Sequence, residues 1–67
     1  MAKRVVTQGG GQNLYKVVGS SKLEIFHVKV GTFSDSKTKI GSSRNLEDAL
    51  SIIKSHSGNQ IKEVREW

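Results

Sequence analysis

Lysine and arginine offer this chain its clearest chemistry, because they outnumber the acidic residues and lie mostly in its first two-thirds. The net charge is +5, and residues 1–44 hold eight basic and two acidic side chains, whereas residues 45–67 hold three and four. Clustered cations bind polyanions, since each phosphate contact releases counterions whatever the base sequence. The pattern predicts a nucleic-acid-binding module whose phosphate contacts come from Lys16, Lys29, Lys37, Lys39 and Arg44.

Aromatic side chains among these cations would serve as stacking platforms for bases or sugars. Tyr15 and Phe33 are the expected contacts, and Phe26 and Trp67 are further aromatic residues of the chain. The alternative is a solvated basic surface, because lysines on an open sheet face also confer solubility and prevent pairing between sheet edges. Neither alternative implies readout of a base sequence or a choice between DNA and RNA.

A second candidate site lies where Ser42, Ser43 and Arg44 precede an expected helix. Two hydroxyls, a guanidinium and free backbone N–H groups at a helix start are suited to an anion. An ordinary strand-to-helix turn is the alternative, because Glu47 and Asp48 in the first helical turn already complement the helix dipole.

Catalytic and metal-binding patterns are missing from the sequence. There is no cysteine, and His27 and His56 have no nearby carboxylates at metal-ligand spacing. Adjacent residues on a helix point about 100° apart. The carboxylates of Glu47 and Asp48 therefore cannot act together on one substrate. We therefore expect no enzyme, metal, cofactor or small-molecule substrate.

Segment lengths and residue types predict an α+β domain that spans residues 1–67. Runs rich in Val, Ile, Tyr and Phe predict strands at 3–7, 14–18, 23–30 and 36–40. Asn45 as an N-cap, an apolar stripe and Gly58 predict a helix from residue 46 to about 55. Residues 61–67 fit a final strand better than a second helix. The expected fold is a small curved antiparallel sheet of three to four strands, one packed helix near the C-terminus, and a final short strand.

Alternation along residues 23–30 divides that strand into two faces. We expect Phe26, Val28 and Val30 to face the helix, which leaves Leu23 and Ile25 as an apolar patch on the other side. Such a patch needs strong sheet curvature or a second copy of the chain to cover it. A protein-interaction or homodimerisation module is therefore the alternative function.

The next strand places Lys37 and Lys39 together on its outward face, so one face of the sheet is expected to be basic.

The sequence has no run of about 18 apolar residues and no signal-peptide pattern. A cytoplasmic protein that does not enter the membrane is expected.

Overall fold

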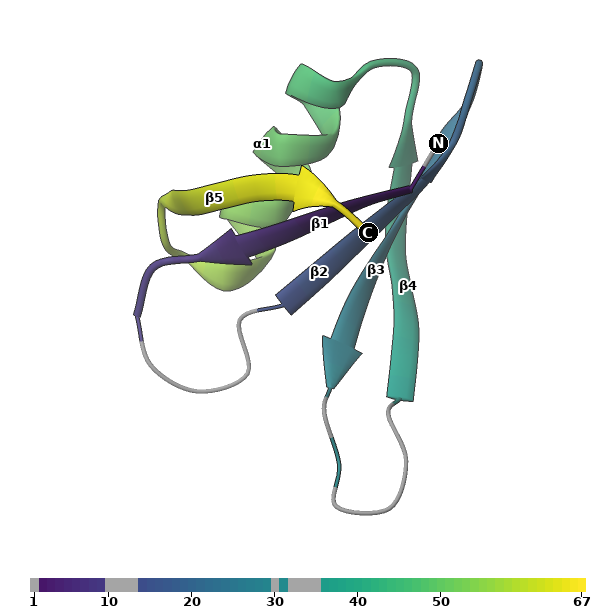
Figure 1. Cartoon of the computed structure of the whole chain (residues 1–67). Coiled ribbons are helices and arrows are strands. Elements are labelled where there is room, and N and C mark those ends of the chain that lie inside the picture. The colour runs from purple at the N-terminus through teal and green to yellow at the C-terminus, as the bar shows by residue number, and fades with distance from the viewer. Residues whose placement is uncertain (1, 10–13, 30, 32–35) are drawn as a thin grey trace.

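The computed structural model describes residues 2–9, 14–29, 31 and 36–67 and contains one antiparallel sheet with one helix (Figure 1). In chain order the elements are β1 (Ala2–Thr7), β2 (Leu14–Gly19), β3 (Leu23–Lys29), β4 (Ser36–Ser43), α1 (Leu46–Ser57) and β5 (Ile61–Glu66). The strand order across the five-stranded sheet is β4-β3-β2-β1-β5. The predicted α+β fold is confirmed, including the final strand.

The first four strands form a meander, so each strand pairs with its neighbour in sequence. The tight turn between β2 and β3 requires glycine at position 19, where φ is 136° and a Cβ atom would lie 2.0 Å from the Lys22 carbonyl oxygen. After β4 the chain crosses the sheet as α1 and returns along the free edge of β1 as β5. The chain therefore brings its last strand beside its first.

Helix α1 begins and ends where the capping residues predict. The Asn45 side chain accepts a hydrogen bond from the Asp48 backbone N–H at 2.8 Å. Gly58 adopts the left-handed conformation with φ of 73°, and its N–H donates to the Lys54 carbonyl at 2.8 Å. Within the described part of the chain, no helix is long and apolar enough to cross a membrane.

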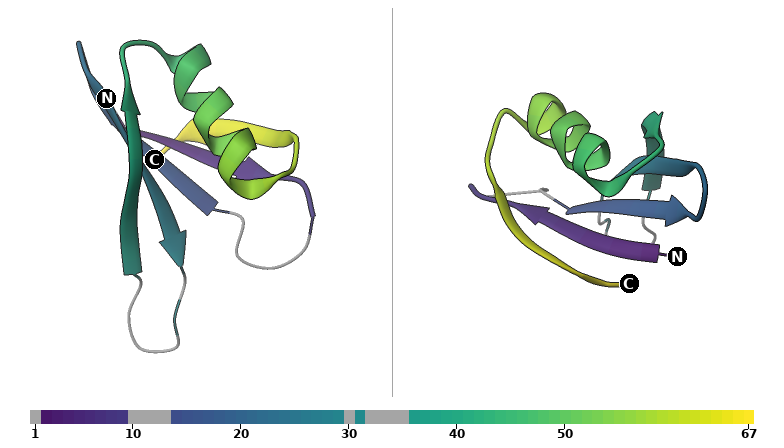
Figure 2. Two further views of the ribbon diagram at one scale, coloured as in Figure 1. Left: turned by 180° about the vertical axis from the view of Figure 1, so that it is seen from behind. Right: turned by 90° about the horizontal axis from the view of Figure 1, so that it is seen from above.

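The helix covers one face of the sheet, and no helix covers the other in the parts of the chain that Figure 2 draws as ribbon. Ala49 and Ile53 are fully buried against strand residues. The core cluster consists of Val5, Tyr15, Val17, Leu23, Ile25, Ala49 and Ile53. A single helix thus gives the sheet an apolar face and leaves an open face.

The predicted core face of β3 is wrong. Leu23 and Ile25 are 2% and 0% exposed beneath the helix, whereas Phe26 is half-buried on the open face. Val28 is buried on that open face as well, and Val30 lies outside the described residues. Alternation separates two faces without stating which one meets the helix, and both faces of this strand carry apolar residues. The exposed apolar patch expected at Leu23 and Ile25 does not exist.

Strand β4 extends three residues beyond its predicted end. Its pairing with β3 shifts register at a bulge and then continues to Ser43. Ile25 lies opposite Gly41 and Phe26 lies opposite Lys39, so Ile40 is the extra residue. Gly41 then fits closely under the helix, where an added Cβ would lie 3.4 Å from Ile52 Cγ2. Ser42 and Ser43 therefore belong to a strand and not to a turn.

Tyr15 joins β2 to the helix through an aromatic cluster. Its hydroxyl is 2.8 Å from His56 Nδ1, and its ring centroid is 4.9 Å from that of His27. Burial raises the pKa of Tyr15 above its usual value, and a hydrogen bond with Ser57 acts in the opposite direction. The phenol is thus a neutral part of the helix–sheet contact.

This cluster predicts a loss of stability in alkali. A phenol whose pKa is raised by folding holds its proton more tightly in the folded state, so stability is complete below about pH 10 and falls as the pH rises through the folded pKa. Urea unfolding from neutral to alkaline pH should show that fall, and Tyr15→Phe should remove it while costing about 1 kcal/mol at neutral pH. Tyr15 is the sole tyrosine, so phenolate absorbance reports on it alone. Titration of the folded phenol at its ordinary pKa would contradict this account.

Candidate functional site

A row of side chains crosses the open face from one sheet edge to the other. Residues directly opposite in antiparallel strands lie on the same face of the sheet. Arg4 pairs with Lys16 on one side and with Arg65 on the other. Lys16 pairs in turn with Phe26, and Phe26 with Lys39. The register therefore places four cations and one aromatic ring in line across five strands.

Lys37 adds a fifth cation to this face. It pairs with Val28 in the adjacent row, two residues along β4 from Lys39. Partial desolvation lowers the pKa of Lys16 below its usual value, and the nearby Lys37 ammonium lowers it further. Lysines from β2 and β4 are therefore close enough to repel each other, although β3 separates their strands. We call Arg4, Lys16, Lys37, Lys39 and Arg65 the basic face.

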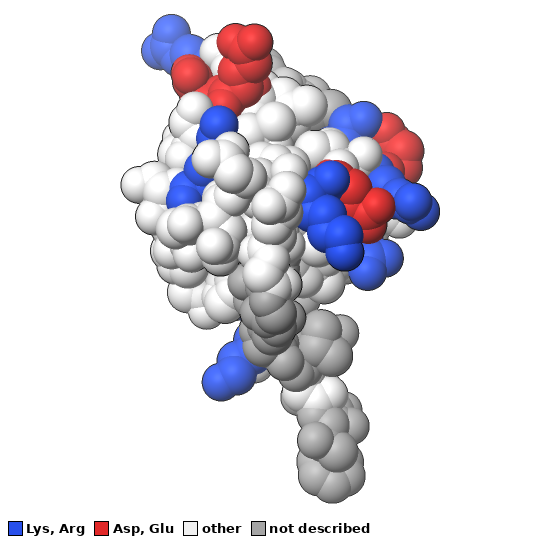
Figure 3. Space-filling view, turned by 90° about the vertical axis from the view of Figure 1, so that its left-hand side faces the viewer, with Lys and Arg blue, Asp and Glu red and all other residues white. Residues whose placement is uncertain are grey.

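Acidic side chains neutralise only part of the basic face. Three exposed ion pairs lie on or beside it: Lys39 Nζ to Glu24 Oε1 at 3.1 Å, Arg65 Nε to Glu63 Oε2 at 3.1 Å, and Lys3 to Glu66. Figure 3 shows red acidic side chains among the blue basic ones on the right-hand side of the view. Exposed pairs of this kind are weak and screened by salt. Arg4, Lys16 and Lys37 form no ion pair with any described acidic residue.

Trp67 forms one wall of a hollow on the open face, which we call the Trp67 hollow. Its volume is about 370 Å³, and it is lined by Arg4, Leu14, Val28, Glu66 and Trp67. The Trp67 backbone N–H donates to the Ala2 carbonyl at 3.1 Å, which ties the indole to β1. Lys16 Nζ lies 4.4 Å from the centroid of the indole ring, and Trp67 as a whole remains 49% exposed. An aromatic surface is thus held among the cations.

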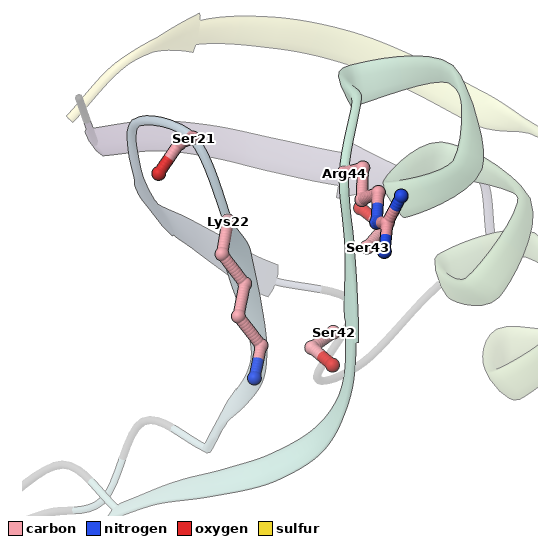
Figure 4. Close-up of a pocket in the computed structure, with 5 residues that line it drawn as sticks. All are labelled: Ser21, Lys22, Ser42, Ser43 and Arg44. Atoms are coloured by element: carbon pink, nitrogen blue, oxygen red, sulfur yellow. The ribbon is translucent and has the colours of Figure 1, made fainter.

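A second hollow lies at the end of the sheet where the β2–β3 turn approaches the end of β4. Its volume is about 380 Å³, and it is lined by Ser21, Lys22, Ser42, Ser43 and Arg44, drawn in Figure 4. We call it the serine hollow. In Figure 4, Ser42 points into the space between the two segments and Lys22 runs along the opposite side of that space, whereas Arg44 points from β4 toward the helix. The structure thus joins the three predicted anion-binding residues to a turn that sequence reasoning had not connected with them.

Asn45 caps the helix start beside the serine hollow. Asn45 already accepts hydrogen bonds from the backbone of the first helical turn, through its side chain from Asp48 and through its carbonyl from Ala49. The Ser43 hydroxyl donates to the Asn45 carbonyl at 2.8 Å. The side chains that line the hollow and suit an anion are chiefly Lys22, Ser42 and Arg44.

Two other predicted contacts, Tyr15 and Lys29, lie away from the basic face. Tyr15 is 2% exposed beneath the helix, so its ring is not available for stacking on a ligand. Lys29 is exposed near the end of β3, and alternation from Phe26 places it on the opposite face. Phe33 lies outside the described residues. The pairing of β1 with β5 instead adds Arg4, Arg65 and Trp67, which no local pattern links.

No protein-family model, no curated protein and no solved structure matches this chain. Among the residues that the structure describes, no group of three or more His, Asp or Glu side chains is placed to hold a metal ion.

The closeness of Lys16 and Lys37 can be measured directly. Lys37→Ala removes a like charge, so the pKa of Lys16 should rise toward its usual value. The control variant Lys29→Ala removes one positive charge from the opposite face of the sheet and should leave the Lys16 pKa unchanged. Side-chain NMR titration of the lysine ammonium groups reads both effects. Equal shifts from the two variants would show that Lys37 is not a special neighbour of Lys16.

Proposed function

We propose that this protein binds nucleic acid through the basic face, with Arg4, Lys16, Lys37, Lys39 and Arg65 contacting phosphates. The observation that carries the proposal is the strand register, which places these five cations on one open face of the sheet. Lys16 and Lys37 come close enough there for Lys37 to lower the pKa of Lys16, and no described carboxylate is paired to either. Like charges held together raise the free energy of the unbound protein. A phosphate seated between them relieves that repulsion, so the arrangement favours a polyanion.

The dimensions of the row suit a chain of phosphates. Adjacent strands lie about 4.8 Å apart, so Arg65 and Lys39, at the two edges of the sheet, are separated by roughly 19 Å along the row. A nucleic-acid strand in B-form geometry carries one phosphate per about 3.4 Å of axis. Several phosphates therefore fit across the face. Lys39 and Arg65 can exchange their exposed ion pairs with Glu24 and Glu63 for phosphate contacts at little cost, because such pairs are weak.

The serine hollow extends the same surface toward the end of the sheet. Ser42 pairs with Glu24, so it lies on the open face beyond Lys39 along β4. Lys22 and Arg44 form no ion pair with any acidic residue in the described parts of the chain. We assign this hollow a phosphate of the same bound strand.

The alternative of a homodimer loses its original basis, because Leu23 and Ile25 are buried within one copy of the chain. A basic face that serves only solubility remains the rival explanation. The two explanations differ in one respect: binding of nucleic acid depends on where the cations lie, whereas solubility depends only on how many there are.

Removing two central cations tests the proposal against that rival. The double variant Lys16→Ala, Lys37→Ala should lower the slope of log binding constant against log salt concentration by about 1.5, since each lost phosphate contact removes about 0.7 to 0.9. The matched control Lys29→Ala, Lys54→Ala deletes two exposed lysines outside the basic face. Fluorescence anisotropy with a labelled oligonucleotide at several salt concentrations measures both slopes. Equal slopes for the two variants, or no binding by the unaltered protein at low salt, would refute the proposal.

The serine hollow makes a separate prediction. Lys22→Ala combined with Arg44→Ala should reduce the same salt slope by about 1.5, because both cations would contact phosphate. NMR chemical shifts of Ser42 and Ser43 should also respond to added oligonucleotide in the unaltered protein. An unchanged slope together with silent serine resonances would remove this hollow from the bound surface.

A further inference from the structure

The Trp67 hollow differs from the rest of the basic face because its floor is apolar. Leu14 and Val28 pair across β2 and β3, and Val28 is only 2% exposed. Cations that contact only phosphate need no such floor, since both partners are strongly hydrated. A floor of aliphatic carbon beside an indole suits a flat, weakly hydrated ligand group.

The indole is held in place and still accessible. Its backbone is hydrogen-bonded to β1, and the Lys16 ammonium lies over the ring at 4.4 Å from the centroid. A cation–π contact at an exposed site is weak, so Lys16 can leave the ring for a phosphate. A ligand that supplies both a phosphate and a π-system would then replace the ammonium on the ring and bind the ammonium as well.

The carboxylate at the rim indicates which part of a nucleotide enters. Glu66 lines the hollow beside Trp67, and its carboxylate forms an exposed ion pair with Lys3, of the weak kind that a ligand can replace. A carboxylate accepts hydrogen bonds from the amino and imino groups on a base edge. Apolar floor, aromatic wall and acceptor rim together match a nucleobase, while the surrounding cations match its phosphates.

We propose that the Trp67 hollow holds one unpaired nucleobase stacked on the indole, so that the basic face binds single-stranded nucleic acid in preference to duplex. The inference rests on the proposed function and names its substrate class. A duplex keeps its base faces inside the stack and presents mainly phosphates, so it can use the cations but not the hollow. An unpaired base can use both.

The fluorescence of Trp67 tests this inference, because it is the sole tryptophan of the chain. Three probes are compared at low salt: a short single strand of mixed sequence, its duplex with the complement, and the same single strand made abasic. Stacking should quench the indole with the first probe and leave it nearly unchanged with the other two. Trp67→Ala should weaken single-strand binding about tenfold, which is typical of losing one base–aromatic stack, and leave duplex binding unchanged. Trp67→Phe should retain most of the single-strand affinity that Trp67→Ala loses.

Each other outcome counts against the inference in a distinguishable way. If the single strand and the duplex bind equally and Trp67→Ala changes neither, the phosphate contacts stand and the hollow takes no base. If indole fluorescence depends on protein concentration and not on oligonucleotide, a second copy of the chain occupies the hollow. If none of the probes binds, the proposed function and this inference fail together.

Discussion

One helix can cover only one face of a sheet, and this constraint decides how the rest of the molecule is arranged. Helix α1, which is twelve residues long, packs on the side of the sheet that carries Tyr15, Val17 and Ile25. Alternation along each strand then sends the neighbouring residues to the open face. Because that face is solvated, it accommodates cations, and antiparallel pairing brings cations from distant parts of the chain into one row. Burial on one side therefore gathers charge on the other.

The bulge in β4 allows one strand to place lysines on the open face and apolar residues against the core. The extra residue, Ile40, packs against the core, while Lys39 keeps its place opposite Phe26 on the open face. After the bulge, Gly41 provides the close approach to Ile52 that α1 needs. The same strand continues to Ser42 and Ser43, so the shift that fits the helix also forms one wall of the serine hollow.

The sequence predicted the elements well because their signals are local. The Asn45 cap, the apolar stripe of α1, Gly58 and the short β2–β3 connection each act within a few residues. The face assignment of β3 failed because Leu23 and Ile25 compete with Phe26 and Val28, and only the position of the helix decides between them. The outward placement of Lys37 and Lys39 followed from alternation alone and did not depend on that choice.

The candidate site was predictable only in part, because its residues meet through long-range pairing. Lys16, Lys37 and Lys39 were expected on the basis of charge. Arg4 and Trp67 required the pairing of β1 with β5, which joins the two ends of the described chain. Tyr15 was misassigned because an aromatic residue in an amphipathic strand reads equally well as a core residue or a platform. Its hydrogen-bonding distance to His56 exists only once α1 has packed on the sheet.

The open face of the sheet is where we propose that nucleic acid binds. Mapping amide and indole chemical shifts during titration with a short single-stranded oligonucleotide at low salt tests it most directly. We expect the largest changes on Arg4, Lys16, Lys39 and the Trp67 indole N–H, and almost none on the amides of α1. Changes centred on α1, or none at any oligonucleotide concentration, would contradict it.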